Sequence, residues 1–167
     1  MFELERISKE AIAGALEKAE RYRLLSEPLL AESICLDVLE VDPDNQPAIV
    51  MLILALSDQF SHAAPSELAK ARDLLRRLTD EYDRSYYAGI LAERRATALL
   101  ELGGGQRGQV AYELYVEAMN WYQQARSLGP SDNDDPILRW NTCARLIKKY
   151  PHVRPAPDDP AEHQMLE

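Results

Sequence analysis

Cysteine and long apolar runs are both scarce in this chain of 167 residues. The two cysteines, Cys35 and Cys143, lie far apart within apolar helical patterns, so we predict neither a disulfide framework nor a cysteine-based metal site. The longest uninterrupted apolar run, Ala48–Leu56, has nine residues, whereas a membrane-spanning helix needs roughly twenty. These absences predict a protein without a transmembrane helix, in a reducing compartment.

Basic residues are also few, because 19 Lys and Arg residues face 28 Asp and Glu residues and give a net charge of −9. Nucleic acids and anionic lipid surfaces are bound by clustered cations, so neither is an expected partner. The first residues, Met1–Arg6, lack the basic start and apolar stretch of a secretory signal peptide. We therefore expect a cytoplasmic protein.

Patterns that carry catalysis are missing as well. The three histidines, His62, His152 and His163, have no His or Cys partner at metal-ligand spacing. No serine stands in a nucleophile-elbow pattern, and the paired carboxylates lie at helix caps, in turns or near the C-terminus, where helix dipoles account for most of them. The sequence thus predicts no catalytic residue, no metal site and no cofactor.

Helical periodicity is what the sequence has in abundance. Apolar residues recur at three- and four-residue spacing, as in Ile12, Leu16 and Ala19, and no segment alternates long enough to predict a strand. Prolines, glycines and capping residues divide the chain into about seven helices, the first from about residue 5 to 25. Further boundaries are expected at Ser26–Pro28, Val41–Asn45, Ser61–Ser66, Asp83, Gly103–Gly108, Gly129–Pro130 and Asp135–Pro136.

Two regions differ in composition. Residues 1–150 carry the helical pattern, and residues 151–167 contain four prolines and four acids. We expect a helical domain over 1–150 and a Pro-rich acidic tail over 151–167, extended or disordered. Docking of this tail back onto the domain is an alternative.

An internal repeat connects three of the expected helices. Each has Ala, an apolar residue at +4, a small or medium apolar residue at +7, and Pro or Asp at +12. The repeats start at Ala31, Ala71 and Ala118, separated by 40 and 47 residues. A unit of 34 residues leaves excesses of about 6 and 13, which we assign to insertions at Ser61–Ser66 and Gly103–Gly108.

The segment Ala31–Asn45 resembles the second helix and closing turn of a tetratricopeptide repeat, and residues 118–133 are similar. The resemblance extends over Ile12–Tyr150, although Ala15 replaces the family's usual Trp and only Tyr22 matches in the first helix. It implies an all-α fold, a right-handed superhelix of about three helical hairpins with a C-terminal capping helix.

That family implies a non-catalytic protein–protein interaction scaffold that holds a partner peptide or protein in the concave face. Tyr and Trp make good interface anchors and Arg binds carboxylates, although core packing and solvated arginines explain the same residues. Arg95 is the clearest example of a residue with both explanations, because it interrupts the apolar stripe of its helix. The candidate partner-binding residues are Tyr86, Tyr87, Arg94, Arg95, Arg139 and Asn141.

Other functions stay open. A small acidic chaperone for a specific protein, of the type III secretion class, has this size and charge. The run Gly103–Gly108 precedes a helix as a phosphate-binding loop does, but it lacks a preceding strand and the Lys-Ser/Thr of nucleotide loops. The family's Lys and Asn peptide-carboxylate clamp is not expected, because Ile49–Leu56 contains neither. Self-association through exposed repeat ends is a further alternative.

Overall fold

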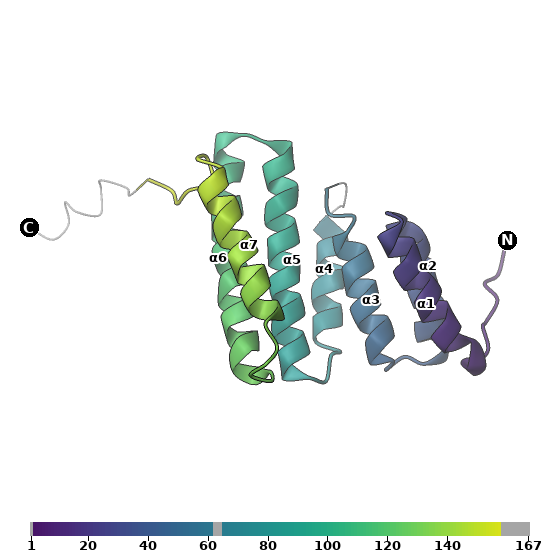
Figure 1. Cartoon of the computed structure of the whole chain (residues 1–167). Coiled ribbons are helices and arrows are strands. Elements are labelled where there is room, and N and C mark those ends of the chain that lie inside the picture. The colour runs from purple at the N-terminus through teal and green to yellow at the C-terminus, as the bar shows by residue number, and fades with distance from the viewer. Residues whose placement is uncertain (1, 62–64, 158–167) are drawn as a thin grey trace, which may run out of the picture.

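A computed structural model describes residues 2–61 and 65–157 of the chain. Within these residues it contains seven α-helices, a 3-10 turn η1 (Lys9–Ala11) and no strand, which confirms the predicted all-α fold. The helices follow one another from the hairpin of α1 and α2 at one end to α6 and α7 at the other, where α7 overlies α6 in this view (Figure 1). They are α1 (Ile12–Leu24), α2 (Pro28–Val41), α3 (Gln46–Ser57), α4 (Pro65–Leu75), α5 (Glu81–Leu102), α6 (Gly105–Leu128) and α7 (Asp135–Lys149).

Local sequence signals explain most of these boundaries. Prolines stand at the start of α2, α3 and α7, where a missing N–H costs little. The Asn45 side chain accepts a hydrogen bond of 2.9 Å from the backbone N–H of Ala48, and Gly129 ends α6. Each of these boundaries was predicted from the sequence.

The first helix begins later than predicted. Residues 2–8 are not helical, and α1 starts at Ile12 instead of near Glu5. Phe2 and Leu4 are fully exposed, so a helix there would have no apolar surface to bury, whereas α1 starts at Ile12, which packs on the core. Arg6 instead donates a hydrogen bond of 3.0 Å to the carbonyl of Glu40.

Two capping residues differ from the predicted ones. The residue that caps α5 is Asp80, whose Oδ1 accepts a hydrogen bond of 2.7 Å from the backbone N–H of Tyr82, and the predicted Asp83 lies inside the first turn. At α7 the N-cap position is Asp134, one residue before the predicted Asp135.

The glycine run forms a much shorter loop than predicted. Only Gly103 and Gly104 separate α5 from α6. Both have a positive φ, 68° at Gly103 and 101° at Gly104, a conformation that favours glycine. Gly105 already belongs to α6, and Arg107 donates to the carbonyls of Leu102 and Gly103 at 3.1 and 3.0 Å. Four of the residues assigned to an insertion, 105–108, therefore belong to α6, which has 24 residues.

The buried apolar residues form two clusters. The first belongs to α1–α4 and the turn after α4, and the second belongs to α5–α7. Leu91 of α5 is part of the first cluster, and Tyr87 packs against both. The helix α5 therefore joins the two halves of the molecule.

The end of the described chain packs against the second cluster. Val153 is only 2% exposed, and the carbonyl oxygen of His152 lies so close to Gly108 that an added Cβ would be 2.3 Å away. The chain thus stays packed for three residues beyond position 150, the predicted end of the helical domain. Residues 158–167, most of the predicted disordered tail, lie outside the described residues.

None of the described helices combines the length and the apolar character needed to cross a bilayer.

Candidate functional site

The six residues predicted to bind a partner do not form one site. Four of them are engaged with other residues of the protein itself. Arg95 is turned the other way, toward α4 and α6, and Asn141 lines a separate pocket between α6 and α7. The four engaged residues are Tyr86, Tyr87, Arg94 and Arg139.

Arg94 is bound to the end of α3. Its guanidinium donates to the carbonyl of Leu54 at 3.2 Å and to Ser57 Oγ at 2.7 Å, and it forms an ion pair with Asp58. Asp58 also pairs with Arg23 of α1 at 2.7 Å. One carboxylate therefore links three helices, and the Arg94 guanidinium is bound within the protein.

Arg139 is committed to a buried carboxylate. Glu93 is 6% exposed and accepts hydrogen bonds from Arg139 Nη1 at 3.0 Å and from the Tyr122 hydroxyl at 2.5 Å. Burial, together with the negative charge of Glu93, raises the pKa of Tyr122. A buried carboxylate needs such partners because isolated charges are costly to bury, so this triad stabilises the α5–α6–α7 packing.

The tyrosines form a packed cluster. The Tyr86 ring stacks on Tyr82 with centroids 5.7 Å apart, meets Tyr87 edge-on at 5.3 Å and tilts against Tyr122 at 5.9 Å. Burial raises the pKa of Tyr87 to about 12. These distances are those of favourable aromatic pairs. Packing within the protein therefore explains the presence of these tyrosines.

The surface is hollowed between α4 and α6, where Arg95 lies. Both helices flank α5, and two adjoining pockets of about 210 and 350 Å³ lie between them. Small residues of α5 form the floor, namely Ser85, Ala88 and Ala92. We call this continuous depression the α4–α6 groove.

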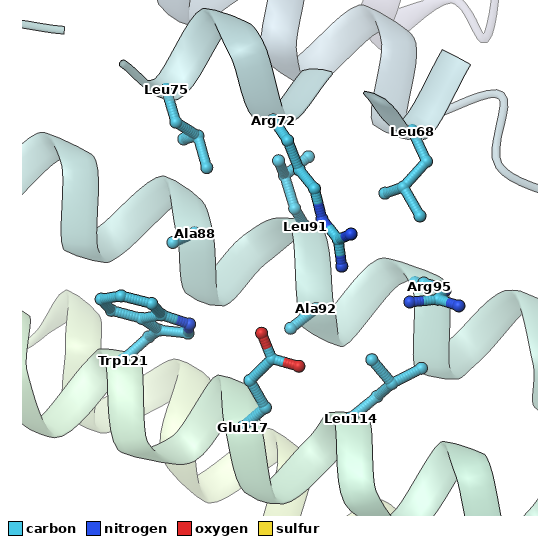
Figure 2. Close-up of a pocket in the computed structure, with 10 residues that line it drawn as sticks. All are labelled: Leu68, Arg72, Leu75, Ala88, Leu91, Ala92, Arg95, Leu114, Glu117 and Trp121. Carbon is cyan, nitrogen blue, oxygen red and sulfur yellow. The ribbon is translucent and has the colours of Figure 1, made fainter. Parts of the chain in front are cut away.

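Its walls are regular helical stripes. Side chains of α4 and α6 face one another across α5 (Figure 2). The α4 wall consists of Leu68, Arg72 and Leu75. The α6 wall consists of Leu114, Glu117, Trp121, Gln124 and Leu128, at alternating spacings of three and four residues that keep them on one helix face. Trp121 lines both pockets.

The groove contains two arginines, Arg72 and Arg95. Within residues 2–61 and 65–157, neither Arg72 nor Arg95 forms a salt bridge, whereas Arg84 at the other end of the groove pairs with Glu81 at 3.6 Å. Figure 2 shows Arg72 and Glu117 pointing toward each other from opposite walls. Of the six predicted residues, Arg95 is the one that this groove contains.

A second groove lies between α2 and α4, with a volume of about 470 Å³. It is lined by leucines, but both of its cations, Lys70 and Arg77, have partners inside the protein. Lys70 pairs with Glu67 at 3.0 Å, Asp73 pairs with Arg76 at 2.9 Å, and Arg77 hydrogen-bonds the carbonyl of Pro43. The α4–α6 groove is therefore the better candidate for recognising a charged ligand.

The described residues do not offer the elements of a metal or thiol site. They contain no group of three or more His, Cys, Asp or Glu side chains placed to hold a metal ion. Cys35 and Cys143 are free and buried, and burial raises the pKa of each thiol to about 12, which disfavours the reactive thiolate.

The sequence could have indicated part of the groove. Arg95 is predicted from its interruption of an apolar stripe, whereas Trp121 is not among the candidate residues. Arg72 and Glu117 were missed, because exposed charges at helical spacing are the usual pattern of a solvated face.

Comparison with known proteins adds no further constraint: no family model, curated protein or solved structure matches this chain. The tetratricopeptide resemblance therefore stays a prediction.

Proposed function

We propose that the chain is a non-catalytic protein-interaction module of stacked helical hairpins, and that the α4–α6 groove holds its partner. The observation that carries this proposal is an apolar groove around Trp121 that contains Arg72 and Arg95, neither of which has an ion-pair partner among the described residues. Exposed apolar grooves on soluble proteins commonly mark interaction sites, and Trp and Arg dominate the energetics of interfaces. The two buried free thiols support a cytoplasmic setting.

This surface differs from the one that the sequence favoured. Arg94 and Arg139 are hydrogen-bonded within the protein, and the rings of Tyr86 and Tyr87 pack against each other. A partner binding there would have to displace existing hydrogen bonds and ion pairs. The groove requires no such exchange, which favours it as the binding surface.

The test is selection of binders from a displayed library of random 16-residue peptides, with the full chain as bait. Selected peptides are then measured against Ala88→Trp, which fills the floor of the groove, and against Ala13→Trp, the same substitution at an exposed position of α1. We expect Ala88→Trp to weaken binding at least tenfold and Ala13→Trp to leave it unchanged. Failure to select any peptide, or equal binding by both variants, would contradict the proposal.

A further inference from the structure

We infer that the partner segment is an acidic amphipathic α-helix of about four turns, whose apolar face lies in the α4–α6 groove and whose carboxylates pair with Arg72 and Arg95. This inference rests on the proposed function and specifies the chemistry of its partner. Three features of the groove support it, which are its lining, its length and its charge.

The lining favours a helix over an extended peptide. All three helices that form the groove bond their own backbone groups internally, so they present side chains only. An extended segment would place its unpaired N–H and C=O groups against leucines, alanines and Trp121, and unpaired buried backbone groups are costly. A helix satisfies these groups within itself, which is the basis of helix-in-groove recognition.

The length of the groove sets the length of the helix. On α5 the lining extends from Glu81 to Arg95, and on α6 it extends from Leu114 to Leu128. Each span corresponds to about 21 Å at the rise of an α-helix, which is about 14 residues or four turns of a bound helix. The small floor residues Ser85 and Ala88 would allow its apolar side chains to approach α5 closely.

The charge of the groove selects the polar residues of the helix. Arg72 and Arg95 both line the pocket of about 210 Å³, and Glu117 is the acid among its lining residues. Glu117 points toward Arg72 (Figure 2) and offsets one of the two positive charges, so covering the pocket with apolar side chains would leave a net positive charge uncompensated, at a cost that a partner carboxylate removes. The net charge of −9 repels an acidic helix at long range, so selectivity must come from these local pairs.

The library selection described above tests this inference, because the library is unbiased in charge and conformation. We expect the groove-dependent peptides to be enriched in Asp and Glu and to carry apolar residues at three- and four-residue spacing. A synthetic acetylated probe with that pattern and its Glu→Lys counterpart are then compared. The acidic probe should bind at least tenfold more tightly.

Exchanging the charges in the groove gives the decisive comparison. The double variant Arg72→Glu with Arg95→Glu should prefer the lysine probe, and Arg72→Gln with Arg95→Gln should lose the discrimination. Far-UV circular dichroism checks that both variants are folded. In a Trp140→Phe background Trp121 is the single tryptophan, so its emission should shift to shorter wavelength when the acidic probe binds.

The outcomes separate this inference from the proposed function. Groove-dependent peptides without acidic enrichment, or charge exchange without effect, would overturn the inference and leave the interaction function standing. Tight binding of a probe with a central proline would show that the ligand is extended and would overturn it also. A dimer seen by sedimentation and abolished by Ala88→Trp would identify a second copy as the occupant, against the inference.

Discussion

At the scale of single residues, the buried titratable groups decide how the protein responds to pH. Cys35 and Cys143 have no exposed surface, and burial raises the pKa of each from its ordinary 9.0 to about 12. Burial also raises the pKa values of Tyr82, Tyr87, Tyr115 and Tyr122. In all six groups the neutral, protonated form is the one that the fold favours.

The free energy of unfolding should therefore fall as the pH rises above about 9. Between pH 9 and 12 the unfolded chain loses the thiol protons that the folded chain retains, so the unfolded state binds fewer protons and gains stability. Each thiol contributes a slope of up to about 1.4 kcal/mol per pH unit. Urea unfolding at pH 8, 9, 10 and 11 under reducing conditions measures the decline.

The variant Cys35→Ala is the control for this assignment. It should lower stability at pH 8, because it leaves a small cavity, but its decline above pH 9 should be shallower than that of the unmodified chain. The same slope in both proteins would show that Cys35 does not contribute to the alkaline loss of stability.

The roles of charged residues were the part that the sequence could not reveal. Arg94 and Arg139 were chosen as partner-binding residues from their local surroundings, but their carboxylates, Asp58 and Glu93, are 36 and 46 residues away in the chain. Such pairs form only after the helices have packed. Arg95 was different, because an arginine on an otherwise apolar stripe is a local signal.

At the scale of helices, glycines report how closely neighbouring elements approach. A Cβ added at Gly89 of α5 would lie 2.5 Å from Cε1 of Tyr122 on α6, a distance that forces one of the two to move. The absence of a side chain at this position is thus what lets the Tyr122 ring pack against α5. Gly14 of α1 has nothing within 4 Å of its added Cβ.

Alanine at these two glycines should have opposite effects. Gly89→Ala should lower the free energy of unfolding by about 1 to 3 kcal/mol, because overpacking forces strained rearrangement. Gly14→Ala should raise it by roughly 0.5 to 1 kcal/mol, because alanine costs less conformational entropy in a helix. Urea denaturation of the two variants measures both changes, and a shift of the same sign in both would contradict this view of α5–α6 packing.

Helix boundaries could be predicted wherever a single residue determines them. The prolines at α2, α3 and α7 and the Asn45 cap act within one turn, so the sequence reveals them. The Gly103–Gly108 run was misjudged because a two-residue loop suffices where long helices pack along their whole length. Composition alone does not distinguish that arrangement from a six-residue loop.

At the scale of the whole molecule, the two core clusters are separate bodies of side chains joined at α5. The all-α architecture follows from periodicity, but the groove does not. It depends on α4 having 11 residues beside an α6 of 24, and on α5 packing extensively with α6. Only the length of α6 involves the glycine run, since residues 105–108 belong to this helix, and the packing of α5 with α6 joins residues that the sequence does not place together.

Across this junction, Asp58 is the charged link between the halves. It bonds Arg23 of the first cluster's α1 and Arg94 of α5, and all three side chains are at most 25% exposed. Stacked helical proteins gain cooperativity from such contacts between neighbouring units. Without the carboxylate, two arginines would face each other across the junction, and the halves should unfold less cooperatively.

Asp58→Ala should therefore lower the free energy of unfolding by about 1 to 3 kcal/mol and separate the transitions of the two halves. Both tryptophans, Trp121 and Trp140, lie in the C-terminal half, so tryptophan fluorescence follows that half while far-UV circular dichroism follows every helix. For the unmodified chain the two urea transitions should coincide, as two-state unfolding requires, and for Asp58→Ala they should differ.

Asp73→Ala is the matched control, since the exposed ion pair of Asp73 with Arg76 is local. Coincident curves for Asp58→Ala, or divergent curves for Asp73→Ala, would show that Asp58 does not couple the halves.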